Sequence, residues 1–211
     1  LFYRFFLPLY LPLSEFVNAD GTNNTRETIR ESSPAINPGF QGFAENLITK
    51  YKVIKFPKTG EISIGILSDT HGVLKDTFLD ELQSCDYLLH AGDIGSLKCY
   101  ETLKDLHVPL YIIKGNCDKG EWTKYLPETL AAPIGGKIFY LIHKKSDLPY
   151  PQPEADFIIT GHTHHYEVSK RGTTTFINPG SAGRSRSGSS CTIAILTLDG
   201  DEFSVLPIYA E

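Results

Sequence analysis

Hydrophobic and polar positions follow strand and helix periods from residue 61 onward. Glu61–Ser68 alternates and then becomes wholly apolar, which is typical of a strand that enters the core. Val73–Ser84 and Ser96–Leu106 place apolar residues at helical spacing, so each is predicted to be an amphipathic helix. Further strands are predicted at Asp86–Ala91 and Pro109–Lys114, so strands and helices alternate in this part of the chain.

The second half of the chain shows a succession of short strand patterns, separated by Gly, Pro, Asn or Asp. They cover Thr129–Ile134, Lys137–His143, Asp156–Thr160, Tyr166–Lys170, Thr173–Asn178, Thr192–Leu198 and Glu202–Ile208. We interpret this order as βαβ units followed by an antiparallel meander. It predicts an α/β layered fold with one large sheet or two packed sheets.

Residues 1–58 lack these patterns. An apolar run at 1–13 is broken by two prolines and is shorter than the about 20 apolar residues of a membrane-spanning helix. Residues 14–48 are polar and aperiodic, as linkers are. We therefore expect a leader or flexible N-terminal arm at 1–58 and one globular domain at 59–211, with no transmembrane segment. A cleaved targeting segment remains an alternative.

Composition narrows the classes of function. The 211 residues are 41% hydrophobic and 21% charged, which is a globular balance. A net charge of −5 argues against a broad nucleic-acid surface. The cysteines show no CxxC pair, so we expect thiols and a cytoplasmic location, with a Cys85–Cys99 disulfide as the alternative.

Metal-binding residue types gather where predicted strands end. Asp69 and His71 follow the first strand, and residues at i and i+2 of an extended chain point to the same face. His162 and His164 repeat this spacing after a later strand. Asp93 and Asn116 follow the second and third strands, and His143 ends a later one. Oxygen and imidazole ligands suit Mn²⁺, Fe, Zn²⁺, Ni²⁺ or Co²⁺, and this many side chains fit two ions that share a bridge.

The motifs SDTHG, HAGD, GNCD, GHTH and NPGS follow one another in this order. Together they resemble the signature of the calcineurin-like metallophosphoesterases, and above all its small bacterial and archaeal phosphodiesterase branch. The resemblance covers residues 61–208. It implies a four-layer fold, in which two packed mixed β-sheets are flanked by helices and carry a binuclear metal centre at one edge.

The resemblance also implies a role for each candidate residue. It assigns Asp69, His71 and His164 to a first ion, Asn116, His143 and His162 to a second, and Asp93 to both. The expected cofactors are two divalent ions, with Mn²⁺ favoured and Ni, Fe, Zn and Co as alternatives. The implied activity is that of a phosphodiesterase in which a metal-bridging hydroxide attacks phosphorus in line. Asp93, Asn116 and His143 are the expected catalytic residues.

The sequence departs from the family pattern near the expected substrate. Larger relatives carry a histidine and an acidic residue where Cys117 and Ser96 stand here, so the group that protonates the leaving oxygen is in question. Cys117 is expected to pack as a small residue, with a redox-sensitive thiol beside a metal as the alternative. Lys144 follows His143 where glycine is more usual, and it either narrows the site or contacts phosphate. The candidate substrate contacts are Asn116, Lys144 and Arg184, and the expected substrate is a small phosphoester or nucleotide.

A second hypothesis belongs to another class of function. The metallophosphoesterase-like scaffold subunit of retromer resembles this chain in its SDxH-type and GHTH motifs, but it departs at the third motif and at the later histidine. Because this sequence has Asn116 and His143, the enzyme is favoured over a protein-binding scaffold. Three further histidines, His90, His107 and His165, are expected to be core or surface residues, and a homo-oligomer is left open.

Overall fold

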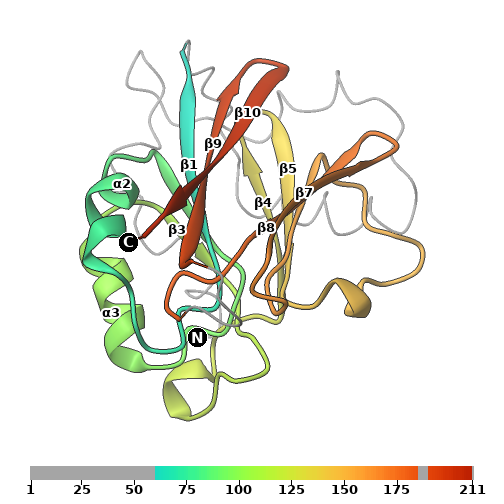
Figure 1. The fold of residues 1–211 in the computed structure, drawn as a ribbon. Coiled ribbons are helices and arrows are strands. Elements are labelled where there is room, and N and C mark those ends of the chain that lie inside the picture. Colours follow the sequence, from blue (N-terminus) through green and yellow to red (C-terminus); the bar gives the residue numbers. More distant parts are fainter. Residues whose placement is uncertain (1–59, 185–189, 211) are drawn as a thin grey trace, which may run out of the picture. The chain divides into compact units, whose positions relative to one another are not determined.

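The computed structural model describes residues 60–184 and 190–210 (Figure 1). The predicted arm at 1–58 lies outside these residues. The described part contains two mixed sheets of five strands each and a few helices. The expected α/β fold with two packed sheets is confirmed.

The first sheet consists of β1 (Ile62–Leu67), β2 (Tyr87–His90), β3 (Leu110–Ile112), β9 (Thr192–Asp199) and β10 (Glu202–Tyr209). Its strand order is β10–β9–β1–β2–β3. β1, β2 and β3 are parallel, whereas β9 is antiparallel to both β1 and β10. The chain therefore returns to the first sheet at its C-terminal end.

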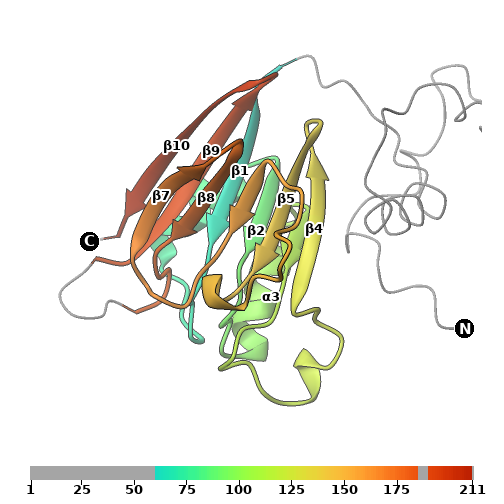
Figure 2. The same ribbon diagram turned by 90° about the vertical axis from the view of Figure 1, so that its right-hand side faces the viewer.

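The second sheet consists of β4 (Thr129–Ile134), β5 (Lys137–Ile142), β6 (Phe157–Ile159), β7 (Tyr166–Arg171) and β8 (Thr174–Pro179). Its order is β4–β5–β6–β8–β7 (Figure 2). β6 is parallel to both β5 and β8, so the predicted antiparallel meander is wrong there. The alternating pattern reports which face of a strand is buried, but it does not report which strand lies beside it.

The helices of the described residues are short. They are the 3₁₀ helices η2 (Asp76–Phe78), η3 (Glu121–Thr123) and η4 (Lys145–Asp147) and the α-helices α2 (Leu79–Gln83) and α3 (Leu97–Asp105). Lys75 is extended, so the helix predicted over 73–84 begins only at Asp76. α3 begins where predicted, because the Ser96 hydroxyl accepts a hydrogen bond from the Cys99 amide. None of these helices has the length and apolar character needed to cross a bilayer.

Apolar side chains join the layers. Between the sheets, Ile64 and Ile66 of β1 belong to one buried cluster with Phe139 and Phe157, whose rings stack with centroids 4.6 Å apart. A second cluster places Phe78, Leu82 and Leu103 of the helices against the outer face of the first sheet. A third covers the outer face of the second sheet, where Leu148, after η4, packs near Ile158. Each such buried side chain contributes about 1.5–3 kcal/mol.

This packing brings the carboxyl ends of β1, β2, β3, β5 and β6 to one edge, the usual position of a site in an α/β fold. The loops that leave these strands are hydrogen-bonded to one another through the backbone. The amides of Asp69 and His71 donate to the carbonyl groups of Gly92 and Asp93, and the Gly161 amide donates to the His143 carbonyl. The loops therefore form one connected platform.

Candidate metal centre

Asp69, His71 and His164 converge at this platform. His164 Nε2 lies 3.2 Å from both Asp69 Oδ1 and His71 Nε2, and the third separation, between His71 Nε2 and Asp69 Oδ1, is 3.7 Å. Ligand atoms about 2.1 Å from one ion lie about 3.0 Å apart in octahedral geometry and about 3.4 Å apart in tetrahedral geometry. The observed separations are close to these values, so the triad fits a divalent ion.

The carboxylate of Asp69 is fully buried, and its two oxygen atoms have different surroundings. Oδ2 accepts hydrogen bonds from the Ser68 hydroxyl at 2.6 Å and from the His162 amide at 2.9 Å. Oδ1 has no hydrogen-bond donor among the described residues, although a buried acceptor in this state costs about 1–3 kcal/mol. A cation between Oδ1 and the two imidazoles would satisfy this oxygen.

The backbone of the ligand loops is strained. Among the described non-glycine residues, positive φ angles between 46° and 70° occur at Asp69, His71, Asp93, His107, His162 and His164. All of these except His107 are predicted ligands. Left-handed conformations at non-glycine residues cost of order 1–3 kcal/mol each and cluster at functional sites. Strain at these positions is therefore consistent with a binding centre.

Asp93 lies between the triad and His143. Its Oδ1 accepts a hydrogen bond from the Cys117 amide at 2.7 Å. Its Oδ2 lies 3.4 Å from His143 Nε2 and 3.9 Å from His71 Nε2. Burial on its own would raise the pKa of Asp93, but His143 and the Cys117 amide lower it below its ordinary value. Asp93 is therefore a carboxylate that faces both groups of ligands.

His143 is oriented by the backbone. Its Nδ1 lies 2.8 Å from the Ala91 carbonyl oxygen, which accepts a hydrogen bond only if Nδ1 carries the proton. Nε2 then points to Asp93, in the arrangement that metal-binding histidines adopt. Burial lowers the pKa of His143, but Asp93 and the Ala91 carbonyl outweigh this effect and raise it. The edge of the His143 ring meets His162, with centroids 5.4 Å apart.

Asn116 and His162 lie at the rim of the centre, and both side chains are exposed. Asn116 Nδ2 donates a hydrogen bond to Cys117 Sγ over 3.2 Å. Cys117 is also exposed, so the expectation that it packs as a small residue is wrong. Together with His71 and Asp93 it forms a group whose ligand atoms all lie within 4.8 Å of one another. Cys117 is exposed because it lies in the turn after β3, which points its side chain outward.

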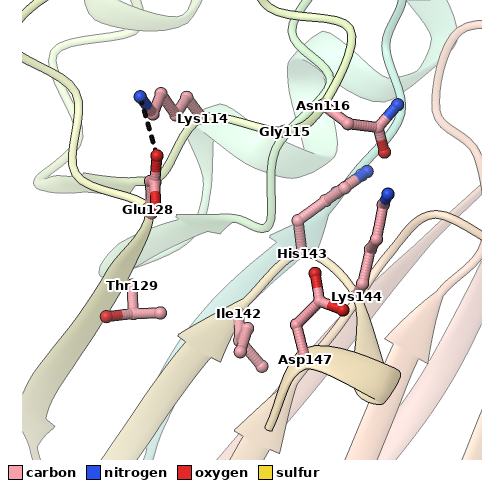
Figure 3. Close-up of a pocket in the computed structure, with 9 residues that line it drawn as sticks. All are labelled: Lys114, Gly115, Asn116, Glu128, Thr129, Ile142, His143, Lys144 and Asp147. Atoms are coloured by element: carbon pink, nitrogen blue, oxygen red, sulfur yellow. Dashed lines mark ion pairs between the residues drawn. The ribbon is translucent and has the colours of Figure 1, made fainter.

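A pocket of about 320 Å³ adjoins the second group of ligands (Figure 3). The predicted substrate contacts Asn116 and Lys144 line it together with His143, and their side chains point toward the same part of it. Arg184 is exposed and does not line the pocket. The structure thus brings five predicted metal ligands close together: Asp69, His71, Asp93, His143 and His164. His162 lies beside His143, and Asn116 and Lys144 are the two predicted substrate contacts that line the pocket.

Comparison with known proteins agrees with this geometry. The family model described as "Calcineurin-like phosphoesterase superfamily domain" matches residues 62–201. The chain belongs to the calcineurin-like phosphoesterase superfamily. It is 27% identical over 166 residues to a "probable metallophosphoesterase" of Methanocaldococcus jannaschii, and the match covers 71% of this chain and 83% of the relative.

Two solved structures share the calcineurin-like fold. An archaeal phosphodiesterase is 22% identical with a TM-score of 0.54, covering 70% of this chain and all (100%) of that chain. Vps29 of Entamoeba histolytica, solved with Zn²⁺, is 23% identical with a TM-score of 0.57, covering 71% of this chain and 98% of that chain. At these identities the likeness concerns the fold.

The end of β8 and the loop after it hold two of the candidate ligand loops in place. Asn178 Nδ2 donates to the Gly161 carbonyl at 2.8 Å and to Thr163 Oγ1 at 3.0 Å. The Ser181 hydroxyl donates to the Asp69 carbonyl at 2.9 Å. The NPGS motif is visible in the sequence, but its contacts are not predictable from it, because they join segments far apart along the chain.

Asp118 and His90 play a similar supporting role. Asp118 accepts hydrogen bonds from the amides of Gly95 and Gly115, at 2.7 and 2.8 Å, and so joins the loops after β2 and β3.

His90 is fully buried, which confirms its prediction as a core residue. Its Nδ1 accepts a hydrogen bond from the Gly92 amide, and its Nε2 lies 3.1 Å from the Thr70 hydroxyl. Burial lowers the pKa of His90 to about 3, so it is a neutral imidazole.

Two glycines lie so close to the carboxylates of Asp69 and Asp93 that no side chain fits at their positions. A Cβ on Gly161 would contact Ser68 Oγ and would lie 2.7 Å from Asp69 Oδ2, and a Cβ on Gly115 would contact Asp93 Oδ1. Any side chain at either position would displace a carboxylate of the centre. The glycines of the GNCD and GHTH motifs therefore serve the geometry of the ligands.

Proposed function

We propose that the protein is a phosphodiesterase that works with two divalent metal ions. The observation that carries the proposal is the buried Asp69 Oδ1, which lacks a hydrogen-bond donor among the described residues and faces the imidazoles of His71 and His164. Asp93, which faces both this triad and His143, supports a second ion beside the first.

The proposed ligand set is the one that the family resemblance implies. The first ion would be held by Asp69, His71 and His164, the second by Asn116, His143 and His162, and both by Asp93. Bound ions would attract the phosphoryl group, stabilise its transition state and lower the pKa of the attacking water. Mn²⁺ is the favoured metal, and Ni, Fe, Zn and Co are the alternatives.

The chain itself orients these groups. The Ala91 carbonyl sets the ring of His143, and the Cys117 amide sets the carboxylate of Asp93, so neither side chain has to reorganise when it binds. The exposed amide of Asn116 lines the pocket, so it could contact a substrate bound there. A diester carries one negative charge fewer than a monoester dianion, and it suits a site with few cationic side chains. The similar archaeal structure is likewise that of a phosphodiesterase.

A protein-binding scaffold has less support. Such a function calls for exposed apolar side chains on the helical face. Within α2 and α3, Leu97 is the large hydrophobic residue that is exposed. The enzyme is therefore the function that the described residues support best.

The test combines metal analysis with turnover. We expect purified protein reconstituted with Mn²⁺ to bind two ions per chain and to hydrolyse bis(4-nitrophenyl) phosphate faster than 4-nitrophenyl phosphate. His164→Ala removes a buried ligand and should abolish both properties. The matched control is His165→Ala, because His165 is the exposed neighbour with no place in the centre. Full activity in His164→Ala, or none in the wild type with any of the candidate metals, would contradict the proposal.

A further inference from the structure

The pocket beside His143 extends away from the metal ligands. From Asn116 and His143 it continues toward Thr129 and Ile142 at the ends of β4 and β5. Its volume of about 320 Å³ lies at the lower end of the range for small-molecule sites, about 300–1,000 Å³. It therefore has room for a group of nucleoside or polyol size next to a phosphoryl group held at the ligands.

The charged side chains that line the pocket are two lysines and two carboxylates. At one end, Lys114 Nζ lies 3.0 Å from Glu128 Oε1, so this pair is neutral (Figure 3). Asp147 and Lys144 are the other two, and they balance in formal charge. Because the lining is neutral as a whole, it favours a neutral polar group over one that carries further phosphates.

Lys144 differs from the lysines around it. Lys114 is paired with Glu128, and Lys145 is paired with Glu167 at 3.2 Å. Among the described residues, no carboxylate lies within 4.0 Å of the ammonium group of Lys144. In Figure 3 this ammonium points to the part of the pocket where Asn116 and His143 end. A half-buried positive charge is thus available beside the ligands.

We propose that the pocket binds the alcohol half of the phosphodiester and that Lys144 stabilises the oxygen with which this alcohol departs. The inference rests on the proposed phosphodiesterase activity and deepens it. It names the substrates as diesters in which one alcohol is neutral, hydroxylated and no larger than a nucleoside. Lys144 is then a catalytic residue, because its ammonium group contacts the departing oxygen.

The step balances as an ordinary hydrolysis. The oxygen of one water forms a bond to phosphorus, and the bond between phosphorus and the alcohol oxygen breaks. The electron pair of that bond stays on the alcohol oxygen, where the positive charge and hydrogen bond of Lys144 stabilise it. The alcohol oxygen takes one proton from solvent, and the attacking water releases one. The products are one alcohol and one phosphomonoester.

The kinetic test uses Lys144→Met, Lys144→Arg and the neighbouring control Lys145→Met. The substrates are methyl 4-nitrophenyl phosphate, whose leaving group needs little help, and methyl phenyl phosphate, whose leaving group needs more. We expect Lys144→Met to lower kcat/KM about 100-fold for the phenyl ester, but less than about tenfold for the nitrophenyl ester. Lys144→Arg keeps the charge and should recover much of the loss, and Lys145→Met should match the wild type. Equal losses for both esters would overturn the role of Lys144.

A second readout does not depend on turnover. Adenosine 5′-monophosphate is titrated into ¹⁵N-labelled metal-free protein, and the amide signals of Thr129 and Ile142 are followed. We expect both signals to shift in the wild type and in Lys145→Met, with an apparent Kd several-fold weaker in Lys144→Met. If neither signal moves in the wild type, the pocket assignment is wrong even if diesters are hydrolysed. If they shift while no metal supports hydrolysis, the proposed activity fails and the subsite stands.

Discussion

The two groups of proposed metal ligands differ in how firmly the chain holds them. Asp69 and His164 are buried, and Asp69 is oriented by a hydroxyl and an amide of the protein. Asn116 and His162, on the other side of Asp93, expose their side chains. A preorganised group loses little conformational freedom when it binds, whereas an exposed one must be ordered. We therefore expect the first ion to bind more tightly, and the second to be ordered together with substrate.

The largest expected effect comes from the residue that the two groups share. Asp93→Ala removes the carboxylate that faces both His71 and His143. We expect metal content to fall from two ions toward none, and kcat/KM to fall by more than about 100-fold. Mass spectrometry of the metal and a diesterase assay measure the two effects. Two tightly bound ions with full turnover in this variant would show that Asp93 does not bridge.

His162→Ala probes the exposed group separately. Its backbone amide still donates to Asp69, so the first group keeps its geometry while the second loses an imidazole. We expect one tightly bound ion to remain and activity to fall about 10–100-fold. His164→Ala, on the buried side, should instead lose the tight ion. Equal metal affinities in the two variants would contradict the difference between the groups.

Ser68→Ala tests the preorganisation itself. The variant removes the hydroxyl that donates to Asp69 Oδ2 at 2.6 Å but leaves every ligand in place. Partners that orient metal ligands typically change metal affinity about 10–100-fold, so we expect the first ion to bind about tenfold more weakly. Ser84→Ala is the matched control, because its hydroxyl donates to the Glu81 carbonyl on α2. Unchanged affinity in Ser68→Ala would mean that the backbone alone orients the carboxylate.

The same contrast explains how much of the site is predictable from the sequence. Candidate ligands such as Asp69 and His71 can be identified from the ends of predicted strands, because their chemistry and their i, i+2 spacing are local. The support of Asp69 by Ser181 joins residues 112 positions apart, and no local pattern encodes such a contact. The exposure of Cys117 likewise depends on a turn whose direction the amino-acid pattern does not reveal. The parallel pairing of β5 with β6 escapes prediction for a similar reason, because pairing is decided by tertiary packing.

The smallest effect concerns His90, which lies beneath the loops that carry Asp69, His71 and Asp93. Burial lowers its pKa to about 3, whereas the pKa of a histidine in an unfolded chain is about 6.5. Below about pH 6.5, His90 therefore binds a proton in the unfolded chain but not in the native protein. The contribution of His90 to the free energy of unfolding is therefore fully present above that pH and is lost as pH falls toward about 3. At about 1.4 kcal/mol per pH unit, His90 alone should lower the free energy of unfolding by about 2 kcal/mol between about pH 6.5 and 5.

Urea unfolding of metal-free protein at these two pH values measures the loss. His90→Gln is the informative variant, because its amide offers an acceptor and a donor near the Gly92 amide and the Thr70 hydroxyl and does not titrate. All other residues are the same in the two proteins, so their contribution cancels in the comparison. We expect His90→Gln to lose about 2 kcal/mol less than the wild type between about pH 6.5 and 5. Identical losses would mean that the imidazole accepts its proton within the native fold, and that the loops above it are less rigid than their hydrogen bonds indicate.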